Sequence, residues 1–374
     1  MRIWRKILSV RFANLQAIFL SRDGKIQTMS FDAPHIEIQA FQRIAEIDPI
    51  EWDRLSGERP FQSYRWHEYG ERVMADCKPT YLLAYKNGVL SARASLWLIR
   101  NEPLPEMPSL MRKALTALFK RWPLLICRSP LVFTGGLIIA EHENQKEFVS
   151  ALSNAALAVA KQQGASLLLF DYLSVADTQS LPRFFNAMSV PDPGTIMENK
   201  WRDYDEYIAV GDRKNRKNYN RTMRELEKLG VKITRHAKVE RIDDALSLIR
   251  NVEQAHGSLP NPWARSMLER MEMVNGTFVT AALGEQIVGC GLLLEDNNAQ
   301  TTTLLGHAKD VPFVYFMIVY ESLKVAFEHK VRALRWGSGA YDIKQRLGFS
   351  LEDNGAFAFA ATNPLLHKAL GWLK

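Results

Sequence analysis

The chain has 374 residues, of which 47% are hydrophobic and 24% charged, and its formal net charge is +7. This length and composition support a large core and two domains. The three cysteines lie far apart and form no CxxC pattern, which argues against a disulfide framework and a zinc site, so no bound metal is expected.

The sequence also argues against a membrane-spanning or secreted protein. The longest apolar runs have about half of the ~20 residues that a membrane-spanning helix needs. Arg11 interrupts the apolar region that a signal peptide would require. We therefore expect a cytoplasmic protein.

Residues 1–34 are predicted to be a tail or a wrongly assigned start. A regular pattern of strands and helices begins only around His35, and Met29 is an alternative start.

Residues 35–190 predict a first domain of strands and helices. Asn87-Gly88 lies between two apolar runs and is a strong signal for a hairpin turn. The apolar run at 167–172 is typical of a strand in the middle of a sheet. Strands are predicted at 35–41, 80–85, 89–99, 131–139 and 167–172, and helices at 49–56, 60–74, 143–163 and 178–188.

Residues 100–130 are predicted to be an insertion in this domain. A helix at 110–122 would carry an apolar stripe with lysines opposite it, and such a basic amphipathic helix can lie on the inner face of a membrane. The favoured interpretation is that the stripe packs against its own domain. The apolar residues are Met111, Leu115, Leu118 and Trp122, and the lysines are Lys113 and Lys120.

Residues 191–374 are predicted to form the second domain, after a proline- and glycine-rich break. Their order of helix, helix, three strands, helix and strand repeats that of the first half, although no sequence repeat is visible. Strands are predicted at 231–234, 277–283, 286–295, 301–307 and 333–336, and helices at 243–256, 262–274, 313–329 and 365–373.

A basic helix that begins at residue 213 carries the whole positive excess. Segment 213–235 has nine Lys and Arg and two acids, a net charge of +7. An apolar face should dock this helix, with the cations opposite. Because acids are scarce and arginine suits phosphate geometry, we predict a phosphate site; the alternative is a solvated face. The predicted phosphate-binding residues are Arg216, Lys217, Arg221 and Arg224, and Lys228 continues the stripe.

The stretch 336–349, WGSGAYDIKQRLGF, has the strongest chemical signal. Gly337 and Gly339 break a predicted strand and allow a close backbone approach to a ligand. Tyr341 and Lys344 are three residues apart, so they share a face of the next helical turn. This suits a site where negative charge is bound or develops; the alternative is a tight turn with a solvated lysine.

The pattern G-x-G-x-Y-x-x-K-x-x-x-G-F at 337–349 resembles the closing motif of the FemAB-like acyltransferases, a branch of the GNAT superfamily. Residues 60–66 (PFQSYRW) resemble the N-terminal segment of that family, and 213–231 resemble its basic helix. The resemblance implies an α/β fold with mixed sheets in two tandem GNAT-like domains. It also implies that Lys344 stabilises a developing oxyanion or leaving group, and that Tyr341 positions it or relays a proton.

Two further residues could take part in chemistry. His307 ends a predicted strand where a GNAT strand would meet the donor, so it is a candidate general base; the alternative is a hydrogen-bonding residue at the helix entry. Cys290 could pair with His307 as a nucleophile, but a buried small side chain is the favoured interpretation. Glu295 and Asp296 are predicted to be solvated at a hairpin tip.

One absence bears on the donor. Acetyl-CoA-binding GNATs carry Q/R-x-x-G-x-G/A before the long helix, where backbone amides cradle pyrophosphate. The corresponding residues 307–313, HAKDVPF, contain no glycine. The resemblance therefore favours a bulky polyanionic donor or a phosphate-bearing acceptor.

We expect an N-acyltransferase that moves an acyl or aminoacyl group onto an amine of a cell-envelope-related acceptor, as family members that extend peptidoglycan precursors do. No permanently bound cofactor is expected; the donor would be acyl-CoA or aminoacyl-tRNA. Partners would carry phosphate, as tRNA, CoA and nucleotide- or lipid-linked precursors do. Two alternatives stay open: an acyl-CoA-dependent N-acetyltransferase of a small molecule or polysaccharide component, and a non-enzymatic nucleic-acid-binding module.

Overall fold

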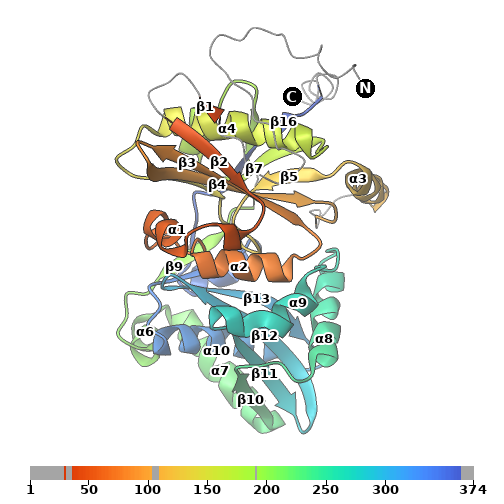
Figure 1. The fold of residues 1–374 in the computed structure, drawn as a ribbon. Helices are drawn as coiled ribbons and strands as arrows, with labels where there is room; N and C mark the ends of the chain where they lie inside the picture. The colour runs from red at the N-terminus through yellow and green to blue at the C-terminus, as the bar shows by residue number, and fades with distance from the viewer. Residues whose placement is uncertain (1–28, 31–35, 103–108, 190–191, 364–374) are drawn as a thin grey trace.

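Two mixed sheets lie one above the other, with helices between them and on their outer faces (Figure 1). The structure is a computed structural model that describes residues 29–30, 36–102, 109–189 and 192–363. The predicted helix at 365–373 and residues 1–28 lie outside the described part of the chain.

The first sheet has the strand order β1-β2-β3-β4-β5-β7-β16-β8, and β6 pairs with β4. Asn87 and Gly88, both in the left-handed region with φ of 52° and 77°, join β3 to β4 as the hairpin signal predicts. The strands are β1 Met29–Ser30, β2 Ile36–Phe41, β3 Lys78–Lys86, β4 Val89–Ile99, β5 Leu124–Cys127, β6 Leu137–Ile139, β7 Leu167–Leu173, β8 Asn186–Ser189 and β16 Ala356–Ala361.

The second sheet has the order β10-β11-β12-β13-β14-β9-β15. Helices α8 and α9 pack on the side that faces the first half, and α7 and α10 cover the other side. The strands are β9 Thr195–Glu198, β10 Val231–His236, β11 Thr277–Leu283, β12 Gln286–Asp296, β13 Ala299–His307, β14 Ala333–Trp336 and β15 Ser350–Leu351.

The helices of the first half are η1 Ile44–Glu46, α1 Pro49–Ser56, α2 Tyr64–Val73, α3 Ser109–Arg121, α4 Gln145–Gln162 and α5 Val175–Ser180. Those of the second half are α6 Tyr204–Val210, α7 Arg213–Leu229, α8 Ile242–Ala255, α9 Ala264–Arg270, η2 Met271–Val274, α10 Val314–Glu328 and α11 Tyr341–Arg346.

In its described residues, each half contains one pair of parallel strands whose connection includes a helix. In the first half the chain from β5 to β7 runs through β6 and α4, and in the second half α10 connects β13 to β14. The repeated order of elements is therefore a repeat of topology.

Two predicted segments differ from the structure in the kind of element they form. The stretch 100–130 is not wholly an insertion, because it contains β5, a buried strand between β4 and β7. The helix predicted at 178–188 is instead α5 followed by β8. Pro182 cannot continue the ladder of helical hydrogen bonds, and residues 186–189 pair with the distant strand β16.

The strand β16 relates the two halves in an unexpected way. The two sheets change over between β8 and β9, next to the expected boundary at 190, yet β16 returns to the first sheet between β7 and β8. The division into domains at 190 stays a prediction, and the sheets themselves do not divide the chain at a single position.

The two halves share one hydrophobic core. Trp66 and Tyr69 of α2 belong to the same buried cluster as Met267 and Leu292 of the second half. The hydroxyl of Tyr69 donates to the carbonyl of Met267 at 3.3 Å. The halves are therefore fixed against each other by packing as well as by the chain.

Asp296 is buried, at 2% exposure, and not solvated as predicted. The backbone N–H groups of Gln62 and Ser63 donate to its carboxylate at 3.0 and 3.2 Å, and the Ser63 hydroxyl donates as well. Ser63 also accepts from the N–H of Trp66 and so caps α2. The segment 60–66 thus binds the β12–β13 hairpin.

Helix α3 is partly packed and partly exposed. Phe119 contacts the shared core, whereas Leu118 and Trp122, the residue after the helix, are 40% and 52% exposed. Contact with a membrane through 110–122 stays a prediction. No helix in the described ranges is long and apolar enough to cross a membrane.

Candidate active site and cationic pocket

A pocket opens where β13 and β14 separate. These parallel strands pair only at Ala299–Ala333 and Gln300–Leu334, and beyond those pairs a cavity of about 530 Å³ lies between them. We call it the strand-gap pocket. Its walls include Thr301, Thr302, Thr303 and Leu305 of β13, Tyr315 and Val319 of α10, Trp336 of β14, and residues 131–133 of the first half.

The glycine motif forms one side of the strand-gap pocket. Gly337 and Gly339 both line it. Gly339 has a φ of +81°, a conformation that side chains disfavour, and a Cβ on Gly337 would lie 2.7 Å from a ring carbon of Phe133. The glycines therefore allow the turn before α11 and the close approach of Phe133.

Lys344 reaches this pocket from α11 and is only 8% exposed. Its Nζ donates to the carbonyl oxygens of Gly337 and Ser338, the latter at 3.3 Å. Burial lowers the pKa of Lys344 to about 8, because the charged form loses hydration. An ammonium held by two carbonyls and facing a cavity can donate to a developing negative charge.

Tyr341 anchors α11 and is absent from the pocket wall. Its hydroxyl donates to the carbonyl of Pro193 at 2.8 Å, and its ring centre lies 6.0 Å from the Nζ of Lys344. This geometry favours the positioning role predicted for Tyr341 over the proton relay.

His307 does not share the strand-gap pocket with Lys344. Its Nδ1 lies 3.1 Å from the carbonyl oxygen of Ala308, and its ring contacts Tyr315, which does line the pocket. The structure therefore brings Lys344, Gly337 and Gly339 together and leaves His307 one side chain away. Cys290 is fully buried, and burial raises its pKa to about 12, so it is a small core side chain.

The basic helix α7 forms as predicted, and its caps explain its limits. The side chain of Asp212 accepts from the N–H groups of Lys214 and Asn215 at its start, and Gly230, with a φ of 71°, ends it. Leu226 is buried, and Tyr219 and Met223 pack on the core of the second half.

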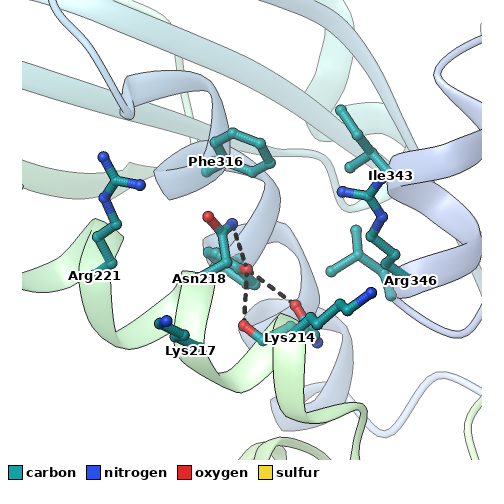
Figure 2. A pocket seen from close by; sticks show the side chains of 10 residues that line it. Lys214, Lys217, Asn218, Arg221, Phe316, Ile343 and Arg346 are labelled. Atoms are coloured by element: carbon teal, nitrogen blue, oxygen red, sulfur yellow. Dashed lines mark hydrogen bonds between the residues drawn. The ribbon is translucent and has the colours of Figure 1, made fainter.

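Part of the basic stripe faces a second pocket of about 280 Å³, between α7, α10 and α11 (Figure 2). We call it the α7 pocket. Of the predicted phosphate-binding residues, only Lys217 and Arg221 line it. Arg216 donates instead to the carbonyl of Ala209, and Arg224 lies outside the lining. The lining residues are Lys214, Asn215, Lys217, Asn218, Arg221, Phe316, Tyr320, Ile343, Arg346 and Leu347.

Sequence reasoning missed Lys214 and Arg346. Arg346 is in the closing motif, but only the folded chain shows that α11 presents it to α7. The sequence did carry a signal for Lys214, because it lies three and seven residues before Lys217 and Arg221 and so shares their face of the helix.

Contacts from the first half hold the motif in place. Arg335, next to the motif, pairs with Glu352 and donates to the Thr134 hydroxyl at 2.8 Å. The amide of Asn354 donates to the carbonyl of Phe133 at 2.9 Å and accepts from the N–H of Gly194 at 2.9 Å. The strand-gap pocket is thus built at the junction of the two halves.

Comparisons with known proteins agree with this architecture. The sequence model of the FemAB-like family, described as peptidoglycan biosynthesis/recognition, matches residues 43–371. The crystal structure of FemX is similar over 86% of this chain and 98% of its own, with 14% identity and a TM-score of 0.60. No curated protein matches the chain.

Two other solved structures are similar. A tandem GNAT protein from the clavulanic acid biosynthesis pathway, solved without acetyl-CoA, matches over 88% of this chain and 99% of its own, with 11% identity and a TM-score of 0.53. A protein of unknown function from Bacteroides thetaiotaomicron matches over 84% and 97%, with 11% identity and a TM-score of 0.50. At these identities the likeness shows the fold, and it confirms the predicted mixed α/β fold of tandem GNAT-like units.

Proposed function

The chain belongs to the FemAB-like family, and from this premise we propose that it is an acyltransferase that moves an acyl or aminoacyl group onto an amine of a cell-envelope-related acceptor. The observation that supports this most is the buried Lys344 ammonium, held by two backbone carbonyls against the strand-gap pocket. The acceptor would be made in the cytoplasm.

The proposed reaction needs no covalent enzyme intermediate. The amine nitrogen attacks the donor carbonyl carbon, and the new N–C bond forms as the carbonyl oxygen becomes negative. Lys344 donates to that oxygen. When the oxyanion collapses, the bond from carbon to the leaving oxygen or sulfur breaks, and the leaving atom takes the proton that the amine gives up.

Threonines of β13 supply neutral polar groups to this pocket. Thr301, Thr302 and Thr303 all line it, but successive side chains of a strand point to opposite faces, and the Thr302 hydroxyl is buried, so the pair on one face is Thr301 and Thr303. Hydroxyls can donate and accept, so they suit an acyl group that itself carries an amine or a carbonyl. This favours an aminoacyl group, although an acetyl group also fits.

An acyl-CoA donor is the second candidate. Two tandem GNAT-like units are the fold of the protein from clavulanic acid biosynthesis, which was solved without acetyl-CoA. Against this donor, the segment before α10 has no glycine, and Phe313 supplies the left-handed residue at its N-cap with a φ of 67°. A side chain thus occupies the place of a pyrophosphate-binding glycine.

A transfer assay tests the proposal. Purified protein is incubated with a muramoyl-pentapeptide nucleotide precursor and either ¹⁴C-aminoacyl-tRNA or ¹⁴C-acetyl-CoA, and label in the precursor is counted. Protein-dependent transfer from either donor is expected, and the productive donor decides between the two candidates. If neither donor labels this precursor or a panel of amino sugars, while RNA binds, the non-enzymatic nucleic-acid-binding module is the correct interpretation.

A further inference from the structure

The α7 pocket gathers four cations that lack acidic partners. Lys214, Lys217, Arg221 and Arg346 line it, and no acid is among its lining residues. Among the described residues, none of the four forms an ion pair. Other cations nearby are engaged: Lys228 pairs with Glu225 at 3.1 Å, and Arg235 pairs with Glu321 at 2.6 Å.

Like charges around one cavity repel one another, and an anion in the cavity removes that repulsion. Figure 2 shows the cations arriving from two directions, with Lys214, Lys217 and Arg221 on α7 and Arg346 on α11. Cations on two helices can contact one anion from two sides, whereas a linear stripe on a single helix can contact it from one side only.

The remaining walls of the α7 pocket are apolar or neutral. Phe316 of α10 and Ile343 and Leu347 of α11 provide apolar surface. At the base, the amide of Asn218 donates to the Tyr320 hydroxyl at 3.0 Å, and that hydroxyl donates to the side chain of Asn215 at 2.9 Å. A bare phosphate would leave the apolar wall unused.

We propose that the α7 pocket binds a phosphorylated nucleoside, with phosphate on the four cations and the base against Phe316. Guanidinium and ammonium groups recognise phosphate, and aromatic side chains recognise the face of a base. The Arg221 guanidinium also lies 5.1 Å from the ring centre of Phe313, a cation–π contact that helps to hold its position. This inference rests on the proposed function, because the nucleoside belongs to the donor or the acceptor of that reaction.

The two pockets share their walls. Phe316 and Tyr320 of α10 line the α7 pocket, whereas their neighbours Tyr315 and Val319 line the strand-gap pocket. In the same way α11 presents Ile343 to one pocket and Lys344 to the other. A ligand that occupies both pockets therefore needs its phosphate and its reacting group to be separated by about one helix diameter, ~10 Å.

The test compares two charge reversals on the same helix. Lys217→Glu/Arg221→Glu changes residues inside the α7 pocket, and Arg224→Glu/Lys228→Glu changes the same stripe outside it. All four residues are exposed, so both proteins should fold, with the stripe variant also losing the exposed Lys228–Glu225 ion pair. Binding is measured by isothermal titration calorimetry with full-length protein.

Three probes distinguish the sources of the nucleoside. Adenosine 3′,5′-bisphosphate represents CoA, an RNA minihelix ending in CCA represents tRNA, and uridine diphosphate represents a nucleotide-linked precursor. At least one should bind to the wild type. Its affinity should fall by at least about tenfold in the pocket variant, since charge-assisted hydrogen bonds are lost, and stay within about threefold in the stripe variant.

Two outcomes would overturn the proposal: no probe binds, or the two variants lose affinity equally, as a diffuse basic surface would predict. Transfer activity keeps this failure separate from that of the proposed function. If the pocket variant retains wild-type KM values while Lys344→Ala loses transfer, the protein is an acyltransferase and the α7 pocket has no part in it.

Discussion

At the scale of single residues, Lys344 combines two properties that rarely occur together. It is buried, and among the described residues its ammonium donates hydrogen bonds only to backbone carbonyls. A surface lysine would keep its hydration, and a structural buried lysine would normally pair with a carboxylate. Burying the ammonium disfavours its charged form, and a role of that charge in the reaction would explain why it is kept.

Replacing Lys344 with alanine should lower kcat by roughly 100-fold or more, the usual loss when one stabilising donor is removed from a developing oxyanion. Initial rates with the donor identified by the transfer assay measure the effect. Lys309→Ala, which removes an exposed lysine just before α10, is the matched control and should leave kcat unchanged. A kcat for Lys344→Ala within a few-fold of the wild type would remove Lys344 from the mechanism.

The pH dependence of kcat should reflect the titration of Lys344. Burial disfavours the ammonium, so Lys344 loses its proton near pH 8 and not near the ordinary value of about 10.4. Because the proposed role needs the charged form, kcat should fall as the pH rises through about 8. Lys344→Arg stays charged, so any residual activity should be flat over this range. A wild-type kcat that rises through pH 8 would mean that Lys344 acts as a base.

At the scale of elements, the sequence predicted those helices and strands whose limits depend on neighbouring residues. The helix α1 and the strands β4, β11 and β14 begin and end where the sequence indicated. The strands β9 and β16 were missed, because each pairs with strands far away in the sequence. The closing motif was visible as consecutive residues, whereas the α7 pocket needs three helices from separate segments, so only Lys217 and Arg221 of its cations were predicted.

The segment 60–66 is an element whose importance the structure explains. Replacing Asp296 with alanine leaves the N–H groups of Gln62 and Ser63 buried without an acceptor. The free energy of unfolding should fall by about 2 kcal/mol or more, as measured by urea denaturation. Asp310→Ala, at an exposed position, should change it by less than about 0.5 kcal/mol. Equal values for the two variants would show that the hairpin contact contributes nothing.

At the scale of the whole molecule, the reaction site depends on both halves. Residues 131–133 of the first half lie beside the glycine motif of the second, and the shared core fixes this contact. A catalytic site at such a junction is sensitive to substitutions that alter the contact between the halves, even when neither half alone would be affected.

Replacing Gly337 with alanine places a Cβ against the ring of Phe133, which must move. We expect kcat to fall by about tenfold, because misplaced catalytic groups lose rate steeply. Phe133→Ala in the same chain makes room and should restore part of the activity, so the two changes should be strongly non-additive. Additive losses in this double-mutant cycle would mean that the contact does not position the motif.

The return of β16 also sets an order in time. Because β8 and β16 are antiparallel neighbours, residues 190–355 are, in effect, one very long connection within a hairpin of the first sheet. Its two ends are joined where the N–H of Glu352 donates to the carbonyl of Gly194 at 2.9 Å. A ribosome that has made the first half has therefore not made its last strand. The first half is therefore begun first but completed last. Until β16 has been synthesised, one edge of β7 has no strand to pair with.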